Sequence, residues 1–590
     1  VNPKKTGYVS ALWEVDPTGV LPARRLTRSR KGESSPVFTD RGDLLFTSRR
    51  PDSDDDSDDD GPATLWLLPA DGSEARVVCR RPGGVGVVRT AGEVIMLEAD
   101  VLANASDEAD ESRIRAARKE TKVAAILHSS YPVRFWDHDV GPGVIRLLAA
   151  PIPSAPTQAG DQVDQLELRQ LTPDARPFDV WGADLASDGS FAVFTSQPMG
   201  EKAARVARLE RVEIATGERT VVLDLPETNL TEPVISPDGS AVAYTQVDPY
   251  TPQRAAYSVL SVVELSTGDH RAVAPDWDQQ PAEYRWTPDG KTLVVAADED
   301  GRAPVFAVDV ASGRVIRVTS DAAAFSDLQV SPDGATVYAL RSSYLGPPAP
   351  VRIDLAAALA SGEPVAAVAL RGPAAEPVLP GRLEEVETTA DDGVRIRSWL
   401  ALPADASPEK PAPVLLWVHG GPVNSWNKWN WRWCPWIMVA HGYAVLLPDP
   451  ALSTGYGREF IQRGWNAWGN RPYTDVMAAF DAVVARPDID STRTAAMGGS
   501  FGGYIANWIA GHTDRFQAIV THASLWSLDQ FGPTTDAAIF WRREMDEAMT
   551  AGHSPHRFVS EIATPMLVTH GDLDYRVPIG EALRLWYELL

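Results

Sequence analysis

Hydrophobic and polar positions alternate with a period of two in short runs along the first two thirds of the chain, and a turn signal precedes each run. The clearest copies are SDGSFAVFTS from Ser187, SPDGSAVAYT from Ser236, TPDGKTLVVA from Thr287 and SPDGATVYAL from Ser331. An Asp-Gly pair supplies the positive φ of a tight hairpin, and the alternation buries one face of the strand that follows. The pattern therefore predicts a domain of repeated β-hairpins.

Weaker copies extend the series toward the N-terminus: DRGDLLFTS from Asp40, AGEVIMLEA from Ala91 and GVIRLLAAP from Gly143. The series then contains seven turn glycines at intervals of 44 to 51 residues, namely Gly42, Gly92, Gly143, Gly189, Gly239, Gly290 and Gly334. Repeats of this size suit four-stranded blades, so the series predicts a seven-bladed β-propeller. We expect LWEVDPTGVLPARRLT, before the first repeat, to supply N-terminal closing strands that complete the last blade and close the ring. The helical pattern at 107–122 is expected to be an insert, either a surface arm or an active-site lid.

The pattern changes after the Pro- and Ala-rich stretch Gly372–Pro380. Nearly continuous apolar runs, VRIRSWLALP, PVLLWVHGG and YAVLLPDP, then alternate with helical patterns such as TDVMAAFDAVVA from Thr474. Such runs are typical of a largely parallel sheet that helices cover on both faces. A chain of 590 residues is also too long for one hydrophobic core. We expect two domains, the propeller at 1–380 and an α/β domain at 381–590.

Charge and composition narrow the class of partner. The formal charge of −25 disfavours nucleic acid, because phosphate binding requires clustered Lys and Arg. The acidic run Asp52–Asp60 lacks the spaced ligands and turn glycine of a calcium loop and is interpreted as a solvated loop. No apolar run long enough to span a membrane and no apolar signal core occur, and the two cysteines are far apart. A cytoplasmic location is expected, with processing before Val1 left open.

The segment RTAAMGGSFGGYIANWIAGH predicts a strand, a sharp turn and a helix, with Ser500 at the turn between glycines. A nucleophile on such a strained elbow needs flanking residues without a Cβ, and the turn lifts the serine hydroxyl clear of the sheet. The alternative is a helix N-cap serine. We interpret Ser500 as the nucleophile of an α/β-hydrolase.

Acyl transfer also needs donors for an oxyanion and a carboxylate that orients an imidazole. The N–H of Phe501, the residue after the nucleophile, is one expected donor, and Gly420 or Gly421 in LLWVHGGP supplies the second unless these glycines only form a tight turn. Asp572 and Asp574 follow a later strand, MLVTH, and we favour Asp574 as the acid, although aspartates are also common turn formers.

These residues together resemble the prolyl oligopeptidase family of serine peptidases. The motifs are HGGP at His419–Pro422, STGYG at Ser453–Gly457, GGSFGGY at Gly498–Tyr504 and HGDLDYRVP at His570–Pro578. The resemblance covers nearly the whole chain, with HGGP similar to the acylaminoacyl peptidase and bacterial dipeptidyl aminopeptidase branches. It implies Ser500 as nucleophile, Asp574 as acid, and a propeller that admits short peptides and excludes folded proteins.

The resemblance leaves substrate preference open between endopeptidase and exopeptidase, and the oligomeric state open as well, a homo-oligomer included. A hydrophobic substrate pocket would involve Tyr504, Trp526 and Phe531, unless these aromatics are plain core. Carboxylates such as Asp298, Glu299 and Asp300 could anchor a substrate amino group, or they are solvated loop charges. No metal or organic cofactor is implied, because no cluster of His, Cys and Asp has ligand spacing.

A catalytic histidine is missing from the expected place. The family's histidine lies some tens of residues after the acid, and none of the ten histidines follows Asp574. His556 and His570 precede the acid, and a structural role is expected for His570. Either the chain continues beyond Leu590 with the last strand, helix and histidine, which we favour, or the serine lacks its base. An esterase on the same machinery and an inactive propeller platform are the alternative functions.

Overall fold

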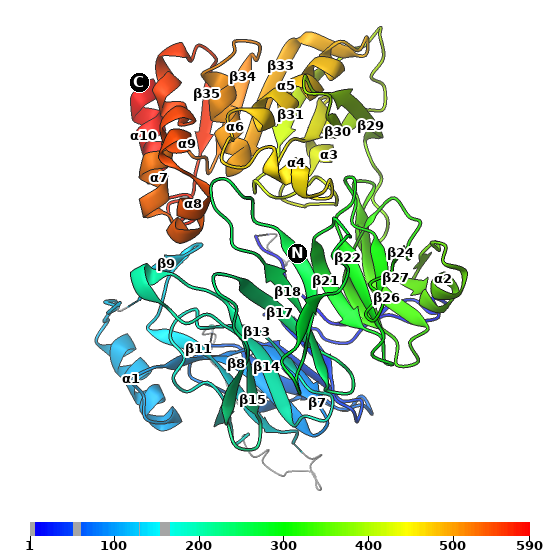
Figure 1. Ribbon diagram of the computed structural model, residues 1–590, viewed down its shortest axis with the longest axis vertical. Coiled ribbons are helices and arrows are strands. Elements are labelled where there is room, and N and C mark those ends of the chain that lie inside the picture. Colours follow the sequence, from blue (N-terminus) through cyan, green and yellow to red (C-terminus); the bar gives the residue numbers. More distant parts are fainter. Residues whose placement is uncertain (1–5, 51–60, 129, 154–165) are drawn as a thin grey trace.

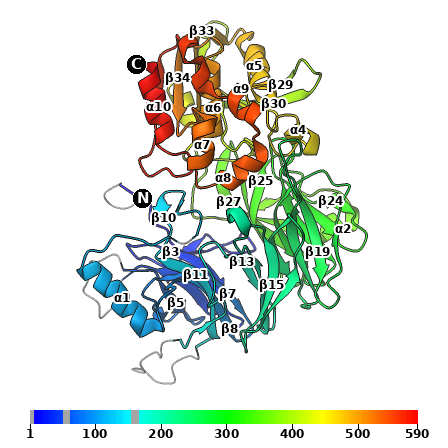
Figure 2. The ribbon, with the colours of Figure 1, turned by 60° about the vertical axis from the view of Figure 1, so that its left-hand side comes forward.

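The computed structural model describes residues 6–50, 61–128, 130–153 and 166–590, so the acidic run interpreted as a solvated loop lies outside the described residues. An all-β body formed by the N-terminal part of the chain lies below an α/β body formed by the C-terminal part (Figure 1). Figure 2 shows the same two layers from a second side. The last strand of the all-β body ends at Ala369, and the first strand of the α/β sheet begins at Gly381.

The described part of the all-β body contains six antiparallel four-stranded sheets and forms a β-propeller. Consecutive sheets contact each other through their innermost strands, from β3 through β7, β13, β17 and β21 to β25. The strands of the six sheets are β3 (Glu33–Phe38), β4 (Leu44–Ser48), β5 (Thr64–Leu68) and β6 (Arg76–Cys79); β7 (Val85–Ala91), β8 (Val94–Leu102), β11 (Gly143–Pro151) and β12 (Arg169–Gln170); β13 (Val180–Leu185), β14 (Phe191–Ser196), β15 (Arg208–Glu213) and β16 (Arg219–Leu223); β17 (Asn229–Ile235), β18 (Ala241–Val247), β19 (Ser258–Glu264) and β20 (His270–Ala272); β21 (Pro281–Trp286), β22 (Thr292–Ala297), β23 (Val305–Asp309) and β24 (Val315–Arg317); β25 (Ala324–Val330), β26 (Thr336–Ser343), β27 (Gly346–Asp354) and β28 (Val368–Ala369).

The repeat count of seven does not match these six sheets, because the copies from Ala91 and from Gly143 share one sheet. Strand β8 of the first copy pairs antiparallel with β11 of the second over its whole length. Gly143 is a strand residue, whereas the other six turn glycines have φ between 54° and 85°. The insert between β8 and β11 separates the two halves of one long hairpin, which therefore resembles two repeats in the sequence.

The expectation that the N-terminal strands complete the last blade is wrong, because they form a separate two-stranded sheet, β1 (Trp13–Glu14) with β2 (Arg24–Arg25). This sheet lies against the end of the propeller, since Ala23 N–H donates to the Arg371 carbonyl at 3.0 Å and Arg371 donates to the Val20 carbonyl at 2.8 Å. The first and last segments of the described propeller thus meet.

The insert between β8 and β11 contains the predicted helix and a small hairpin. The N-cap residue of helix α1 (Glu108–Glu120) is Asp107, whose side chain accepts a hydrogen bond from Asp110 N–H. Strands β9 (Arg134–Phe135) and β10 (His138–Asp139) then pair with each other, and β9 lies at the edge of the α/β body in Figure 1. Shorter elements elsewhere in the propeller are α2 (Leu355–Ser361) and the 3-10 helix η1 (Glu201–Ala203).

The α/β body is built on one seven-stranded mixed sheet in the order β29-β30-β32-β31-β33-β34-β35. Its strands are β29 (Gly381–Thr389), β30 (Arg395–Pro403), β31 (Ala412–Val418), β32 (Ala444–Asp449), β33 (Ile489–Gly499), β34 (Ala518–His522) and β35 (Met566–Thr569). Five neighbouring strands of this sheet run parallel, namely β32, β31, β33, β34 and β35. Its helices are α3 (Pro435–Ala440), α4 (Arg458–Gln462), α5 (Arg471–Val484), α6 (Phe501–Ala510), α7 (Leu528–Thr534), α8 (Ala538–Glu544), α9 (Glu547–Gly552) and α10 (Gly580–Leu589), with the 3-10 helix η2 (Pro555–Glu561).

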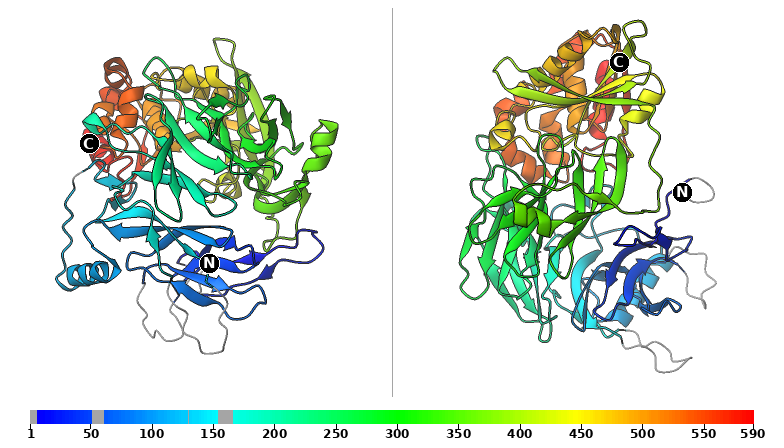
Figure 3. Two further views of the ribbon diagram at one scale, coloured as in Figure 1. Left: turned by 60° about the horizontal axis from the view of Figure 1, so that its bottom comes forward. Right: turned by 90° about the vertical axis from the view of Figure 1, so that its right-hand side faces the viewer.

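Alternate residues of the central strands enter opposite cores, as expected for a sheet covered on both faces (Figure 3). Val414 and Leu416 belong to the core under α5 and α6, whereas Leu415 and Trp417 belong to the core under α3. This packing fixes the register of the sheet, because a slip of one residue would reverse the two faces.

That register aligns the carboxyl ends of four parallel strands at one edge. Val418 pairs with Gly498, Gly499 with His522, and His522 with Thr569. Loops that follow these strands meet at the crevice where ligands bind in open α/β sheets.

Candidate active site

Ser500 stands alone between β33 and α6, with a backbone φ of 56° and ψ of −122°. A non-glycine residue with positive φ is uncommon and strained, and such strain concentrates at functional sites. The Ser500 N–H donates to the His522 carbonyl at 3.0 Å, which ties the turn to the end of β34. The sequence interpretation of a strand, sharp turn and helix here matches the structure.

The glycines around Ser500 allow the turn to pack against its neighbours. A Cβ on Gly498 would lie 2.3 Å from the Gly502 carbonyl carbon, and one on Gly502 would lie 2.1 Å from the Val418 carbonyl oxygen. Both distances are far below van der Waals contact. A side chain at either position would therefore displace backbone atoms of the elbow or of β31.

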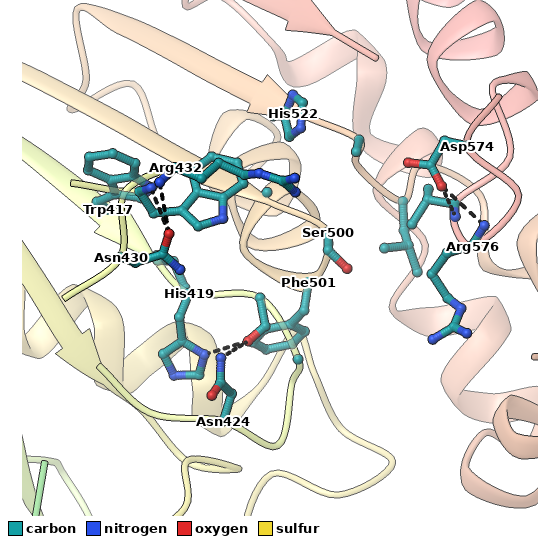
Figure 4. Close-up of a pocket in the computed structure, with 18 of the residues that line it drawn as sticks. Trp417, His419, Asn424, Asn430, Arg432, Ser500, Phe501, His522, Asp574 and Arg576 are labelled. Carbon is teal, nitrogen blue, oxygen red and sulfur yellow. Dashed lines mark hydrogen bonds between the residues drawn. The ribbon is translucent and has the colours of Figure 1, made fainter. Parts of the chain in front are cut away.

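The two predicted oxyanion donors lie on either side of the elbow. Phe501 is the first residue of α6, where a backbone N–H has no partner within the helix. Gly420 approaches from the loop after β31, since a Cβ on it would lie 3.4 Å from the Cβ of Ser500. Its carbonyl accepts hydrogen bonds from His419 Nδ1 at 2.8 Å and Asn424 Nδ2 at 3.3 Å (Figure 4). The Gly420 carbonyl and the Gly421 N–H belong to one planar peptide unit. The two hydrogen bonds to the carbonyl therefore also fix the direction of the Gly421 N–H.

Asp574 lies across the cavity from this loop, beside Arg576 (Figure 4). Its Oδ1 accepts hydrogen bonds from the backbone N–H groups of Arg576 at 3.1 Å and Val577 at 2.9 Å. Its Oδ2 lies 3.8 Å from His570 Nε2. Asp572, the other candidate acid, is exposed and is not among the residues that line the cavity. Of the two aspartates, the structure brings Asp574 to the site.

One cavity of about 910 Å³ brings these groups together. Its lining includes, among the predicted site residues, Gly420, Gly421, Ser500, Phe501, Phe531 and Asp574. The other two predicted pocket aromatics lie elsewhere: Tyr504 is fully buried and donates to the His553 carbonyl, and Trp526 is fully buried with its indole N–H on Glu588. They are core residues, because both are fully buried and neither is among the residues that line the cavity.

Sequence reasoning missed the aromatic residues that replace them. Trp468 and Trp541 line the cavity with Phe531, and their rings pack edge to face with centroids 5.5 Å apart. Trp136 and Asp137, from the β9–β10 hairpin of the propeller, complete the wall. No motif marks these positions, since they come from distant segments that only the tertiary fold brings together.

The histidines divide between the cavity and the core. His522 and His419 line the cavity. Burial lowers the pKa of both imidazoles. For His522, the nearby His570 and Arg432 lower the pKa further, whereas the Asp574 carboxylate raises it. His522 Nδ1 lies 2.9 Å from the Thr569 hydroxyl, and His419 Nε2 lies 3.0 Å from the Ser453 hydroxyl. Neither ring is hydrogen-bonded to Ser500 among the described residues.

The two histidines considered from the sequence as substitute bases are held by other groups. His570 Nε2 lies 2.7 Å from the Val577 carbonyl, to which it donates, and its side chain is buried. The backbone of His556 is tied to Trp526, and the residue does not line the cavity. The structural role expected for His570 agrees with this geometry.

The carboxylates considered as anchors for an amino group lie where the propeller meets the α/β body. Asp298 accepts from Asn427 Nδ2 at 2.7 Å and from the Thr454 hydroxyl, and burial raises its pKa. Glu299 pairs with Arg317, and Asp300 pairs with Arg395. All three are thus engaged in contacts within the chain, and none is among the residues that line the cavity.

Neither a membrane-spanning helix nor a cluster of metal ligands occurs in the described residues. No helix among them is long and apolar enough to cross a membrane. In the same part of the chain, no group of three or more His, Cys, Asp or Glu side chains is arranged to hold a metal ion.

Comparison with known proteins places the site in a family. Residues 429–590 match Peptidase_S9, the prolyl oligopeptidase family. A probable dipeptidyl-peptidase 5 of Aspergillus clavatus is 27% identical over 503 residues, which are 78% of this chain and 68% of that protein. A dipeptidyl-peptidase 5 of Porphyromonas gingivalis is 28% identical over 369 residues, with 60% of this chain and 52% of that protein covered.

Solved structures share the fold. The acylaminoacyl peptidase of Pyrococcus horikoshii superposes with a TM-score of 0.72 at 14% identity, over 94% of this chain and 81% of that one. The family match covers the elbow and the loop of Asp574, and the fold match extends over the propeller as well. Residues 429–590 of the chain therefore match the prolyl oligopeptidase family of peptidases, and the whole chain is similar in fold to a peptidase of known structure.

Proposed function

We propose that this protein is a serine peptidase that cleaves short peptides through an acyl-enzyme formed on Ser500. The observation that carries the proposal is the strained elbow, which presents Ser500 in the same cavity as Asp574 and the glycine loop. A helix N-cap serine would use its side chain to cap the helix, and Ser500 makes no such hydrogen bond.

The chemistry follows from the positions of these groups. The Ser500 hydroxyl attacks the carbonyl carbon of the scissile bond while an imidazole base accepts its proton. The resulting oxyanion accepts hydrogen bonds from the Phe501 N–H and from an N–H of the Gly420–Gly421 loop. Protonation of the leaving amine by the imidazolium breaks the C–N bond, and water then hydrolyses the ester to free Ser500. Asp574 orients the imidazole and stabilises its charged form.

The base is the remaining part of the triad. Hydrolases with this elbow carry the triad in the chain order Ser, Asp, His, and residues 575–590 contain no histidine. We propose that a histidine serves as the base, and neither His419 nor His522, the two histidines that line the cavity, is hydrogen-bonded to Ser500 among the described residues. The free Oδ2 of Asp574 supports this assignment, because Oδ1 already accepts two backbone N–H groups and Oδ2 has no hydrogen-bond partner among the described residues.

Short peptides are the substrate class that suits the site. The propeller hairpin forms part of the cavity wall, so a folded protein would meet the propeller before it reached Ser500. The curated relatives are named dipeptidyl-peptidases, and the solved structure is an acylaminoacyl peptidase. We propose release of N-terminal dipeptides as the main activity, with acylated amino acids as the second substrate class.

Steady-state kinetics test the proposal with the full gene product, including any sequence that follows Leu590. Dipeptidyl anilides are expected to be cleaved, and Ser500→Ala and Asp574→Asn are expected to lower kcat by about 10⁴-fold or more. Blocked acylaminoacyl anilides separate the two substrate classes. Efficient turnover of simple esters without any amide cleavage would contradict the peptidase assignment and favour an esterase.

A further inference from the structure

The β9–β10 hairpin of the propeller crosses to the α/β body and binds it through specific hydrogen bonds. The Tyr131 hydroxyl, just before the hairpin, donates to the Thr535 carbonyl at 2.8 Å and accepts from Ala538 N–H at 3.3 Å. Thr535 lies between α7 and α8, beside the loop that carries Asp574, because its hydroxyl donates to the Arg576 carbonyl at 2.7 Å. The hairpin is thus fixed next to the catalytic acid.

Trp136 at the tip of the hairpin joins that loop by its backbone. Its N–H donates to Asp536 Oδ2 at 2.8 Å, and its carbonyl accepts from Tyr575 N–H at 2.7 Å. Tyr575 follows Asp574 directly in the chain. The propeller therefore supplies one hydrogen bond to the segment that presents the acid and a second to Asp536, which is itself paired with Arg576 of that segment.

The indole of Trp136 reaches the same segment through Arg576. The guanidinium of Arg576 lies over the indole at 4.0 Å from the ring centroid, and it donates to the fully buried Asp536 at 2.6 Å. The backbone N–H of this arginine is one of the two that hold Asp574 Oδ1. A cation held between an aromatic face and a buried carboxylate has little freedom, so the peptide of Arg576 is fixed with it.

The conformation of Trp136 also points to a function. The hairpin loop contains two residues, Trp136 and Asp137, because Phe135 pairs with His138. Trp136 has a φ of 52°, at the first loop position, where such hairpins prefer glycine. The residue is 53% exposed, and it lines the cavity. A bulky residue persists in a strained backbone only where the surroundings hold it, and such strain clusters at functional sites.

We propose that Trp136 is a positioning residue that holds the Asp574–Val577 loop so that Asp574 Oδ2 faces the catalytic imidazole. The inference rests on the proposed serine peptidase function and adds to it a propeller residue that acts on the acid. The propeller then serves as part of the catalytic apparatus in addition to restricting access.

Trp136→Gly tests the proposal, because glycine suits the backbone of this position and removes the indole. The variant is expected to keep or raise the melting temperature while kcat for a dipeptidyl anilide falls about 10-fold to 100-fold with KM changed less than about threefold. Trp136→Phe retains a ring over Arg576 and is expected to recover most of kcat. Trp13→Ala, at an exposed tryptophan of β1, is the matched control and is expected to behave as the parent protein.

Hydrogen exchange of the peptide that spans residues 571–577 supplies a readout that needs no catalysis. Its amides are expected to exchange about tenfold faster in Trp136→Gly and at the parent rate in Trp13→Ala. Unchanged exchange together with unchanged kcat would overturn the positioning role. If the parent protein has no Ser500-dependent activity, the proposed function fails instead, and the exchange result alone still decides whether Trp136 fixes the loop.

Discussion

Single residues with unusual backbone or burial define this site, and glycine is the clearest case. Gly498 and Gly502 are required because a Cβ at either would overlap backbone atoms of the elbow or of β31. Gly420 differs, because a Cβ there would lie 3.1 Å from the Gly499 carbonyl and 3.4 Å from the Ser500 Cβ, which a small shift can relieve. The fold should therefore tolerate a side chain at Gly420, whereas the oxyanion site should not.

Gly420→Ala is expected to lower kcat about 100-fold or more while the melting temperature changes little, because the methyl group displaces the loop that donates to the oxyanion. Gly532→Ala in α7 is the matched control, since no atom lies within 4 Å of the added Cβ. Activity with a peptide anilide and thermal unfolding measure the two effects. Equal activity in both variants would exclude the glycine loop from the oxyanion site.

A buried carboxyl group stands behind the aromatic wall of the cavity. Glu544 is fully buried and accepts a hydrogen bond from Trp468 Nε1 at 2.6 Å. Burial raises its pKa from 4.5 to about 8, and the hydrogen bond from Trp468 only partly opposes this shift. The folded protein therefore holds a proton on Glu544 at neutral pH that the unfolded chain has released.

This difference predicts that stability falls as pH rises from about 4.5 to about 8, by at most about 1.4 kcal/mol per pH unit. Glu544→Gln removes the titration and is expected to reduce that slope. Burial also raises the pKa of Glu581, to about 7. Glu581 titrates in the parent protein and in Glu544→Gln alike, so its contribution to the slope cancels when the two proteins are compared. Urea unfolding between pH 5 and pH 8 measures the slopes, and parallel curves would contradict the buried neutral carboxyl.

Sequence could predict these residues only where a motif required them. Ser500 and Gly420 follow from the chemistry of an elbow and an oxyanion loop, and the structure brings both to one cavity. Tyr504 was predicted for the pocket from its aromatic character alone. Its direction depends on the face of α6 that carries it, and that face packs on the core.

At the scale of elements, the predicted hairpins and βα units are present, but the blade count shows the limit of periodicity. The four strongest repeat copies, from Ser187 to Ser331, each begin one strand of a separate sheet. Gly143 follows an insert of about 40 residues inside a hairpin, and its spacing imitates a new repeat. Spacing alone cannot distinguish a long hairpin from two short ones, because the strands that pair are identified only by their contacts.

Helices α4 and α5 support the active-site loops through one buried ion pair. Asp475 of α5 is fully buried, accepts from Ala451 N–H at 2.9 Å and pairs with Arg463 at the end of α4. Ala451 begins the turn that holds Ser453, the hydroxyl partner of His419. The pair thus connects two helices to the loop behind Gly420.

Arg463→Ala is expected to lower the free energy of unfolding by about 3 kcal/mol, because it leaves the buried Asp475 carboxylate with the Ala451 N–H but without a positive charge beside it. Arg471→Ala, which breaks the pairs of Arg471 with Asp391 and Asp392 nearer the surface, is the comparison and is expected to cost less than about 1 kcal/mol. Denaturant unfolding of the two variants measures the difference. Equal losses would show that Asp475 is satisfied without Arg463.

In the whole molecule, the propeller and the α/β body are joined by charged contacts on one side and by the β9–β10 hairpin with Trp136 on the other. Glu385 of β29 accepts from Arg302 of the propeller at 2.6 Å and from Arg397 at 2.5 Å. Burial would raise the pKa of Glu385, but these two arginines lower it to about 2. The sequence contains no signal for the contacts between the two bodies, since Arg302 and Glu385 are separated by 83 residues and Trp136 and Asp536 by 400. Each is an ordinary loop or strand residue on its own.

The most direct measurement of the central claim is the site at which a fluorophosphonate modifies the full gene product. We expect one adduct per chain, mapped by mass spectrometry to Ser500, absent in Ser500→Ala and formed more slowly in the presence of a competing dipeptidyl substrate. No adduct, or an adduct on another residue with Ser500 unmodified, would contradict the assignment of Ser500 as the nucleophile of a peptidase.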